Sequence, residues 1–578
     1  MKFLRVNMTE RTVKEEEVQE KYSKMGGRHL TSCLVADEVP PLCHALGPNN
    51  KIVIAPGVVT GTSAPSSGRL SVGGKSPLTG GIKESNAGTP FSQRLGRLGI
   101  KAIIIEGLAT EGLWMLKVDK DGAELISAEN LKGKGMYETA DTLFKEYPLK
   151  NSSLMGIGPS GEKRMAMAGI SFNDPEGRPS RYAGRGGLGA VLGSKGLKAI
   201  VVNDAGAPGV SIQNIDLFKQ GQKKLVEAIR THDLTKPGGA LNSFGTAILI
   251  NVLNEVGGLP TRNFSSGQFK GASKTSGESI AEKVKERGGA GMMGHGCHPG
   301  CIIRCSNVYP AADGSEIVSC VEYESDWAFG ANCEIDDLDT IAKLIYHCND
   351  IGLDTIEAGV TVGLAMEAGV ISFGDGNGAI DLLDQIRTGT SLGHILGNGA
   401  EFTGKAYGLT RIPTVKRQAM PAYEPRAVKG IGTTYITSPM GADHTAGYTI
   451  TTEILSVGGQ ADPLDPKGKV ELSKAFQTAT AFIDASGYCL FIAFPILDIS
   501  DGMEGMVETI NGVLGTNWTV SDVGRIGMDI LSIENDFNAK AGFSKEDDRP
   551  PEFMRYEPLP PHNVVFDITD EELDKIWK

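Results

Sequence analysis

The sequence predicts an α+β protein in which a β-rich N-terminal domain is followed by two mainly α-helical domains. Short apolar runs rich in β-branched residues and bounded by Gly or Pro occur at 51–55, 100–105 and 197–202. Such runs are typical of β strands. The chain has 578 residues, which is too long for one ordinary hydrophobic core, so we expect several domains.

Helical periodicity begins after about residue 210. Leu338, Ile341, Ile345 and Cys348 recur at spacings of three and four residues, which places them on one face of a helix. Segments 215–231 and 468–484 have a similar pattern, and the Pro- and Gly-containing stretch at 412–424 indicates a boundary. The expected domains are 1–210 (β-rich), 211–415 (helical) and 416–578 (helical, with a tail from 546 that wraps the surface).

The composition is that of a globular protein, with 40% hydrophobic residues, 22% charged residues and a net charge of −13. We do not expect the protein to bind nucleic acid, because binding to phosphates needs clustered Lys and Arg, which the sequence does not show. The N-terminus lacks the apolar region of a secretory signal. No run approaches the roughly 18 apolar residues of a membrane span. We therefore expect a cytoplasmic protein.

Glycine is abundant, with 76 residues in 578, or about 13%, where about 7% is usual. The glycines lie in short loops, and two such loops belong to an internal repeat. Residues 95–105 resemble residues 192–202, and each copy follows a Gly-containing polar loop, at 85–88 and at 183–187. Two similar halves that each present such a loop suggest one ligand with two similar parts.

A second internal repeat lies in the helical half. The segment NDIGLD at 349–354 resembles DASGYC at 484–489. Both follow a helical pattern, and Gly352 and Gly487 are therefore expected to end their helices in the left-handed conformation. The second copy ends on Cys489, a thiol remote from the others in sequence.

The segment 295–305, HGCHPGCIIRC, brings Cys297, Cys301 and Cys305 within nine residues. Three close thiolates and one remote cysteine, here Cys489, are a common ligand set for a 4Fe–4S cluster. Zinc is the alternative from spacing alone, because His295 and His298 could complete a zinc site. The other thiols are expected to be small buried hydrophobes; they are Cys33, Cys43, Cys320, Cys333 and Cys348.

An ordered set of motifs resembles the aldehyde:ferredoxin oxidoreductase family of tungsten-pterin enzymes over nearly the whole chain. The motifs are SGR at 67–69, KSPLTG at 75–80, SN at 85–86, AGRGGLGA at 183–190, TRNF at 261–264, the cysteine segment, EYE at 322–324, the two helix-end segments and His444. The resemblance implies a β-rich domain that cradles a bis-pterin cofactor.

The resemblance further implies tungsten or molybdenum held by two molybdopterins, one 4Fe–4S cluster on Cys297, Cys301, Cys305 and Cys489, and Mg²⁺ between the pterin phosphates. The backbone carbonyls of Asn86 and Tyr182 would bind the Mg²⁺. By position, the residues that match cofactor contacts of the family are Arg69, Asn86, Gly88, Arg181, Tyr182, Gly184, Arg185, Asn349, Leu353, Asp354, Asp484 and Leu490. The arginines are expected to bind phosphate, because a planar guanidinium can do so bidentately.

The activity implied by the resemblance is oxidation of aldehydes to carboxylic acids with water as the oxygen source. Electrons would pass through the cluster to ferredoxin or a ferredoxin-like subunit, and a homo- or hetero-oligomer is compatible with the family. Glu324 is the expected base, Glu322 is the alternative, and His444 is the expected donor to the substrate oxygen. In a strand, Glu322 and Glu324 would share one face.

Two alternative functions remain. One is reductive chemistry on the same cofactor, such as reduction of a carboxylic acid or an aromatic acyl-CoA. The other is a zinc-stapled binding protein without a redox role. The chain also departs from the family pattern, which usually has Cys-x2-Cys-x3-Cys where this one has Cys-x3-Cys-x3-Cys, and Asp where this one has Asn349. Cys297 is the ligand that the spacing supports least.

Overall fold

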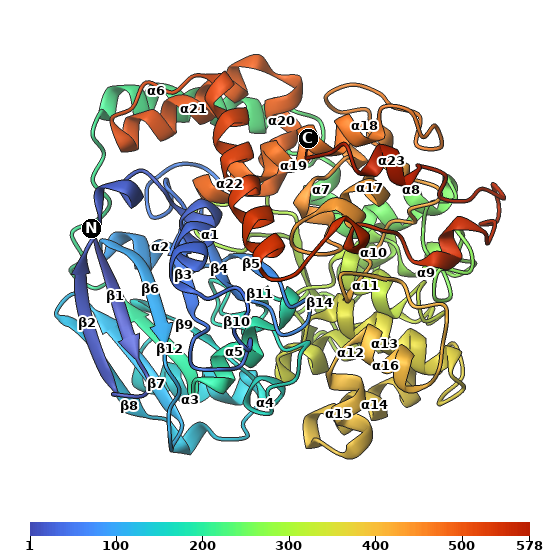
Figure 1. The fold of residues 1–578 in the computed structure, drawn as a ribbon, viewed down its shortest axis with the longest axis horizontal. Helices are drawn as coiled ribbons and strands as arrows, with labels where there is room; N and C mark the ends of the chain where they lie inside the picture. Colours follow the sequence, from blue (N-terminus) through green and yellow to red (C-terminus); the bar gives the residue numbers. More distant parts are fainter. Residues whose placement is uncertain (578) are drawn as a thin grey trace.

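The computed structural model describes residues 1–577 and confirms the predicted fold class. Two six-stranded sheets occupy the N-terminal part, and the rest of the chain is mainly helical. Figure 1 shows the strands of the N-terminal part at the left and the helices above and to the right of them. The boundary between the two helical domains near residue 415 remains a prediction.

The first sheet has the strand order β2-β1-β6-β3-β4-β5. Its strands are β1 (Lys2–Asn7), β2 (Thr12–Glu17), β3 (Ile52–Pro56), β4 (Arg69–Lys75), β5 (Ile82–Gly88) and β6 (Ile100–Glu106). The second sheet has the order β11-β10-β9-β12-β7-β8. Its strands are β7 (Trp114–Asp119), β8 (Gly122–Ser127), β9 (Ser152–Gly156), β10 (Ile170–Phe172), β11 (Arg181–Ala183) and β12 (Leu197–Asn203).

The two sheets have the same topology, so the internal repeat extends to the whole N-terminal part. Strands β6 and β12, which carry the repeated segments, each lie between a parallel and an antiparallel neighbour. These neighbours are β1 and β3 in one sheet and β7 and β9 in the other. Helix α2 (Pro90–Arg97) precedes β6, and helix α5 (Leu188–Ser194) precedes β12. Apolar side chains of both sheets share one core, as those of Ile54, Ile103, Ile170 and Ile200 do.

The predicted helices are present in the second part of the chain. The helix expected around residues 338–348 is α12 (Leu338–Ile351), and all four residues of its predicted face are buried. The other helices used below are α1 (Gly27–Glu38), α6 (Ile215–Thr231), α11 (Tyr323–Phe329), α13 (Thr355–Glu367), α17 (Lys429–Thr437), α19 (Lys469–Ser486), α20 (Ala493–Asp498), α21 (Ser500–Leu514) and α22 (Val520–Lys540).

The cysteine segment forms the loop of a small antiparallel sheet. Strand β13 (Met292–His295) enters it and strand β14 (Ser306–Pro310) leaves it, so His295 and Ser306 are paired at its base. A third strand, β15 (Glu316–Val318), completes this sheet. The loop therefore leaves from a fixed base, which limits where its thiols can lie.

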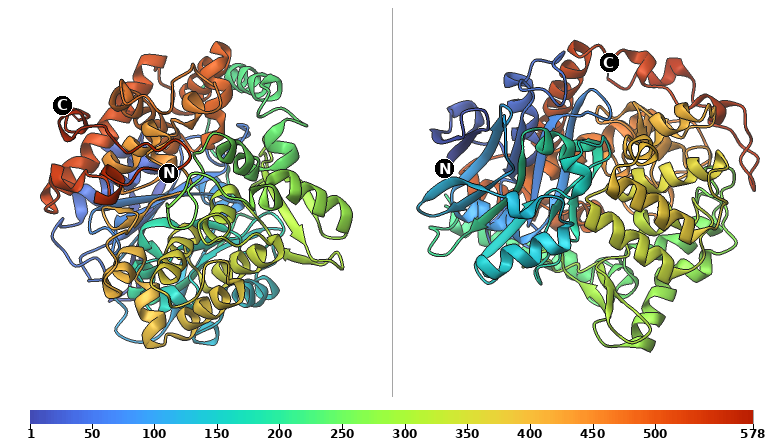
Figure 2. Two further views of the ribbon diagram at one scale, coloured as in Figure 1. Left: turned by 90° about the vertical axis from the view of Figure 1, so that its right-hand side faces the viewer. Right: turned by 90° about the horizontal axis from the view of Figure 1, so that it is seen from below.

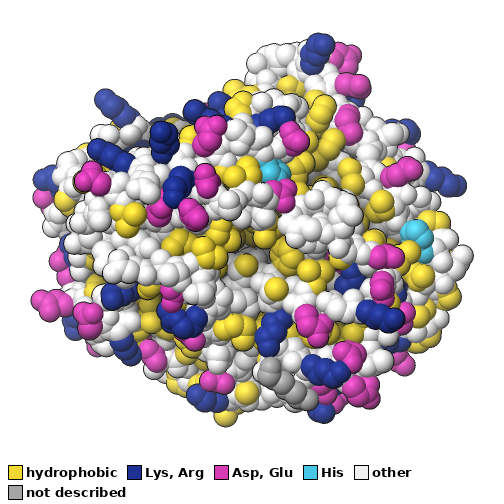
Figure 3. All heavy atoms as spheres, turned by 90° about the horizontal axis from the view of Figure 1, so that it is seen from above, with side chains coloured by type: hydrophobic (Ala, Val, Ile, Leu, Met, Phe, Trp, Pro, Cys, Tyr) yellow, Lys and Arg dark blue, Asp and Glu magenta, His cyan; other side chains and the backbone are white. Residues whose placement is uncertain are grey.

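The C-terminal tail crosses the surface of the helical part, as the sequence predicts (Figures 1 and 2). It is anchored by buried apolar side chains, among them Phe553, Leu559 and Phe566, and it contains the short α helix α23 (Asp570–Leu573). Acidic and basic side chains are interspersed on the face shown in Figure 3. Within residues 1–577, no helix is long and apolar enough to cross a membrane.

Candidate functional site

A cavity of about 420 Å³ lies between the β-rich part and the helices. Every residue that the sequence analysis assigned to a cofactor, a cluster or catalysis lines this cavity. These residues come from both sheets, the cysteine loop, the ends of α12 and α19, and the loop that carries His444. Segments more than 400 residues apart in sequence thus converge here, as Arg69 and Cys489 do through a hydrogen bond.

The edge strands β5 and β11, one from each half of the repeat, form one wall of the cavity. Asn86 on β5 is paired with Ser71, and Tyr182 on β11 is paired with Ser171. The two residues therefore occupy equivalent positions in the duplicated sheets. Their equivalence is the arrangement that the predicted Mg²⁺ bridge between two similar phosphates requires.

The two helix-end motifs dock on the two halves of the repeat in the same way. Gly352 and Gly487 end α12 and α19 with φ of 86° and 92°, which is the left-handed conformation expected for them. The Gly487 carbonyl accepts from the Arg69 backbone N–H at 3.3 Å, and the Gly352 carbonyl accepts from the Gly169 N–H at 2.9 Å. Each half of the β-rich part therefore carries one motif, beside one edge strand.

The three arginines of the cavity have different surroundings. The Arg69 Nε and the Arg181 Nε are buried without a hydrogen-bond partner among the described residues. Arg185 instead donates from Nε to Asp354 at 3.1 Å, from Nη1 to the Ala442 carbonyl at 2.6 Å and from Nη2 to the Ala419 carbonyl at 2.7 Å. The phosphate role expected for Arg185 is therefore not supported, because its guanidinium is already used to tie the second half to the His444 loop.

Several unpartnered polar atoms belong to residues of the cavity wall. Buried side-chain atoms that line it and lack a partner in the described chain are Arg69 Nε, Glu84 Oε1, Ser180 Oγ, Arg181 Nε, Glu324 Oε1 and His444 Nδ1. Buried polar groups are normally hydrogen-bonded, so each such atom calls for an explanation. Arginine donors, a serine hydroxyl and carboxyl acceptors on the residues around one cavity fit a large ligand that carries both phosphates and N–H groups.

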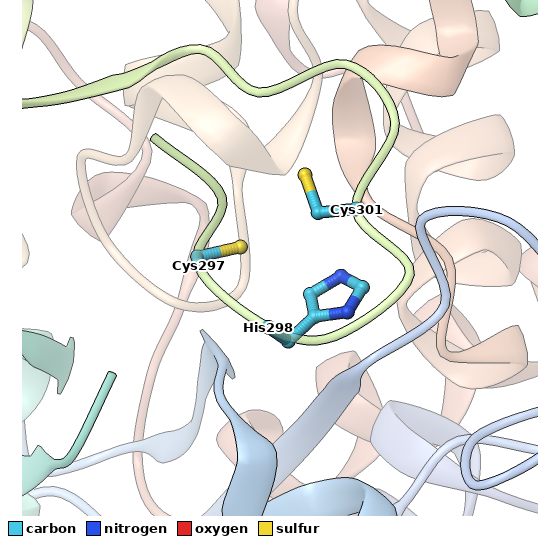
Figure 4. Close-up of side chains that lie close together, drawn as sticks. All are labelled: Cys297, His298 and Cys301. Carbon is cyan, nitrogen blue, oxygen red and sulfur yellow. The ribbon is translucent and has the colours of Figure 1, made fainter. Parts of the chain in front are cut away.

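The cysteine loop brings its first two thiols together (Figure 4). The ligand atoms of Cys297, His298 and Cys301 all lie within 4.8 Å of one another. A hydrogen bond from Cys297 is the main reason that the pKa of the Cys301 thiol is lowered to about 7. The extra residue between these cysteines therefore does not carry Cys297 away from the site.

Neither histidine of the loop has a free nitrogen. His298 accepts from the Gly68 N–H with Nε2 at 3.2 Å, and its Nδ1 lies 2.9 Å from the Pro299 carbonyl. His295 contacts Arg181 through Nδ1 at 3.1 Å and Glu176 through Nε2 at 2.6 Å. These contacts favour the four-cysteine set over a zinc site completed by histidine.

Replacement of Cys297 is expected to remove the iron of the predicted cluster, which is about four atoms per chain. The matched variant His298→Gln should keep its iron, because the imidazole contacts backbone groups rather than a metal. Iron and labile sulfide in the purified full-length variants measure this directly. Full iron in Cys297→Ala together with its loss in His298→Gln would show that the histidine is the ligand.

Glu324 and His444 form a close pair in the cavity. The Glu324 Oε1 lies 3.4 Å from the His444 Nδ1, while the Ala422 N–H donates to Oε2 at 3.0 Å. Burial, aided by the carboxylates of Asp443 and Asp354, raises the pKa of Glu324 to about 8. Burial also lowers the pKa of His444 to about 4, so the imidazole is neutral at neutral pH.

The expectation that Glu322 and Glu324 share one strand face is wrong, because α11 begins at Tyr323. Positions two apart in a helix do not face each other. Glu322 precedes the helix, accepts from the Thr246 hydroxyl at 2.6 Å and lies 3.8 Å from Arg181, on the cluster side. Glu324 alone of the two contacts His444, which favours it as the base.

Sequence reasoning missed a group of tyrosines around His444. The rings of Tyr423 and Tyr448 lie 6.3 and 6.4 Å from the His444 ring, and their hydroxyls are 2.7 Å apart. The Tyr323 hydroxyl donates to the Ala422 carbonyl at 2.6 Å. Tyr323 could have been suspected from its place within EYE, but Tyr423 and Tyr448 come from loops without any recognisable spacing.

The remaining thiols follow the expectation only in part. Cys33, Cys333 and Cys348 are buried, as predicted. Cys43 is only half-buried, so the expectation is wrong for it. Cys320 is buried but lines the cavity, where Arg181 approaches its sulfur at 3.4 Å.

Two family models together match almost the whole chain. The model "Aldehyde ferredoxin oxidoreductase, N-terminal domain" matches residues 3–204, and "Aldehyde ferredoxin oxidoreductase, domains 2 & 3" matches residues 220–578. The chain belongs to the aldehyde ferredoxin oxidoreductase family. It is therefore an oxidoreductase, and the alternative of a zinc-stapled binding protein is excluded.

Relatives in this family are similar over nearly their full length. The chain is 35% identical to the tungsten-containing aldehyde ferredoxin oxidoreductase of Pyrococcus furiosus and 36% identical to that of Pyrococcus horikoshii, covering 97% of this chain and 92% of each relative. It is 26% identical to the P. furiosus aliphatic sulfonate oxidoreductase, WOR-like subunit, over 97% of this chain and 90% of the relative.

A solved structure shares the fold of this family member. It is the active-site complex BamBC of benzoyl coenzyme A reductase with 1,5-dienoyl-CoA, which matches with a TM-score of 0.80 and 18% identity. The match covers 100% of this chain and 92% of that one. At this identity the likeness shows the fold alone.

Proposed function

We propose that this enzyme oxidises aldehydes to carboxylic acids with water as the oxygen source. Each turnover converts one aldehyde and one water into one acid, two electrons and two protons. The observation that carries the proposal is the Glu324–His444 pair in a cavity that the four predicted cluster cysteines and both helix-end motifs also line. The tungsten-containing aldehyde ferredoxin oxidoreductases at 35–36% identity support it.

The residues that line the cavity fit a tungsten or molybdenum bis-molybdopterin. The unpartnered Nε atoms of Arg69 and Arg181 would bind its phosphates, and the Asn86 and Tyr182 carbonyls would bind a bridging Mg²⁺. Asp484, Leu490, Asn349, Leu353 and Asp354 would contact the pterin edges. When bound, the metal supplies Lewis acidity and accepts the electron pair.

The chain's own residues would handle the proton and the substrate oxygen. Glu324 as a carboxylate would take up a proton at Oε1, the oxygen that the Ala422 N–H leaves free. His444, neutral because of its burial, can donate an N–H to the carbonyl oxygen without bringing a net charge. Burial of both groups excludes bulk water and strengthens these interactions.

The cavity has an apolar part in addition to its polar wall. Its lining includes Leu234, Leu241, Leu249 and Phe494, together with Phe491, whose ring stacks on that of Phe494 with centroids 5.6 Å apart. No lysine lines the cavity within the described part of the chain. These features suit an aldehyde with an apolar substituent and offer little to a phosphorylated one.

Electrons would leave through the cysteine loop toward ferredoxin or a ferredoxin-like subunit. Pro299, Gly300 and Arg304 of this loop are exposed, while Cys489 is buried beside Arg69. The loop thus reaches from the cavity to the surface. A redox partner that covers Pro299 and Gly300 would approach the cluster closely.

Reductive chemistry on an aromatic acyl-CoA is the second candidate. The shared fold with the benzoyl coenzyme A reductase complex motivates it. Binding of CoA requires cations for its phosphates. The arginines that line this cavity are the two proposed to bind the pterin phosphates and Arg185, whose guanidinium donates to Asp354 and to two backbone carbonyls. We therefore rank it below aldehyde oxidation.

Anaerobically purified enzyme from cells supplied with tungstate or molybdate is expected to reduce a low-potential dye with benzaldehyde or a short aliphatic aldehyde. The acid product should form in a 1:2 ratio to one-electron-reduced dye. Tungsten or molybdenum and iron are measured on the same sample. A metal-loaded enzyme that turns over no aldehyde, but reduces benzoyl-CoA with a reduced dye, would establish the second candidate instead.

A further inference from the structure

Glu84 is a buried carboxyl group of the cavity wall that no sequence motif singled out. It lies on β5, where Glu84, Asn86 and Gly88 point to the same face of the strand and all line the cavity. Glu84 is only 8% exposed, and its Oε1 has no hydrogen-bond partner among the described residues. Glu84 therefore offers an unpartnered acceptor on a residue that lines the cavity.

The cations near Glu84 are committed to other carboxylates. Arg28 on α1 binds Glu534 on α22 with two hydrogen bonds, at 2.8 and 2.7 Å, and reaches Asp484 at 3.4 Å. Lys83, the neighbour of Glu84 on the strand, directs its Nζ to Asp443 at 3.4 Å. Arg28 therefore contacts two carboxyl groups, Glu534 and Asp484, and within the described residues no cation forms a salt bridge with Glu84.

Glu84 and Asp484 both line the cavity, Glu84 from β5 and Asp484 from the end of α19. The cavity wall thus carries two carboxyl groups that can accept hydrogen bonds from a ligand.

Such a pair suits a ligand edge with several N–H donors. The aminopyrimidinone ring of a pterin offers an amino group and a ring N–H in parallel, which a carboxylate can accept together. We propose that Glu84 binds the pyrimidine edge of one pterin jointly with Asp484. This inference rests on the proposed bis-pterin function and adds a cofactor-binding residue to it.

Glu84→Gln tests the proposal with little change in side-chain volume. An amide can accept at one atom only and brings N–H donors of its own, so it should repel part of the pterin edge. We expect the purified full-length variant to lose pterin and tungsten or molybdenum together by about tenfold, the lower end of effects from groups that support a metal centre. Iron should stay at the wild-type level, because the cysteine ligands are unaffected.

Glu534→Gln is the matched control. It removes a carboxylate from the same Arg28 network that does not line the cavity, so it should lower thermal stability without a selective loss of pterin. Pterin is measured as its fluorescent oxidised derivative, and metals by mass spectrometry. Wild-type pterin content in Glu84→Gln would overturn the proposal, as would parallel loss of pterin and iron in both variants, which indicates a structural role. Wild-type enzyme without pterin, tungsten and molybdenum would overturn the proposed function as well, and that result is visible before any variant is made.

Discussion

Replacing Glu324 by Gln is expected to lower kcat for aldehyde oxidation by about 10²–10⁴-fold, the usual contribution of a positioned general base. The amide fills the same space and can keep the acceptor contact with the Ala422 N–H. Tungsten or molybdenum, pterin and iron should therefore remain at wild-type levels. Steady-state kinetics with one aldehyde and a low-potential dye, on metal-quantified samples, gives the comparison.

The pH dependence provides a signature that a structural defect would not produce. Glu324 must be deprotonated to accept a proton, and its pKa is raised to about 8 by burial. Wild-type kcat/KM should therefore be low at acidic pH, rise as the pH passes through about 8, and level off above it. In Glu324→Gln this rising limb should disappear, because no group titrates at that position.

Glu322→Gln is the control for Glu324. Glu322 accepts from Thr246 and faces Arg181 rather than His444. Its replacement should leave the rising limb of the profile in place and reduce kcat much less. If Glu322→Gln abolished the pH dependence while Glu324→Gln kept it, the assignment of the base would be reversed.

Cys489→Ala is expected to abolish electron transfer to any partner protein and to remove the bound iron. Cys489 comes from the end of α19, far in sequence from the other thiols, and Arg69 donates to its sulfur at 3.5 Å. Without it the cysteine loop offers three thiols, and no described histidine nitrogen beside them is free to replace the fourth. Iron analysis and the broad visible absorption of the cluster report the loss.

Cys348→Ala is the matched control for the thiol. Cys348 is fully buried on α12 and lies outside the cavity lining. This variant should keep its iron and its visible spectrum and lose at most some stability from a smaller side chain. Equal iron in both variants would show that Cys489 is not a ligand.

Local patterns in the sequence predicted much of the fold. The strands at 100–105 and 197–202 and the α12 helix were readable, because apolar periodicity and bounding glycines are local properties. The repeat at 95–105 and 192–202 was also visible. Its extension to two complete sheets was not, because β1 to β5 and β7 to β11 share a topology without a shared sequence.

The site was predictable only where a motif marked it. The cysteines and the two helix-end segments were found, but the choice between Glu322 and Glu324 depended on where α11 begins. The two carbonyl partners of Arg185, on Ala419 and Ala442, are more than 200 residues away in sequence, so its guanidinium could not be assigned correctly from the chain alone. Glu84 was missed for a related reason, since a single carboxyl in a strand acquires meaning only from the charges that surround it.

The equivalent positions of the two helix-end motifs have a consequence for the path of electrons through the proposed enzyme. Gly352 and Gly487 hold equivalent backbone positions, yet one motif continues to the carboxylate Asp354 and the other to the thiol Cys489. The scaffold is therefore duplicated, but only one of the two motifs supplies a predicted cluster ligand. Of the two pterins in the proposed enzyme, one would lie beside the 4Fe–4S cluster and the other beside the ion pair between Asp354 and Arg185. Electrons that leave the cavity would therefore pass through the side of Cys489 only. In this respect the two halves of the proposed site would differ.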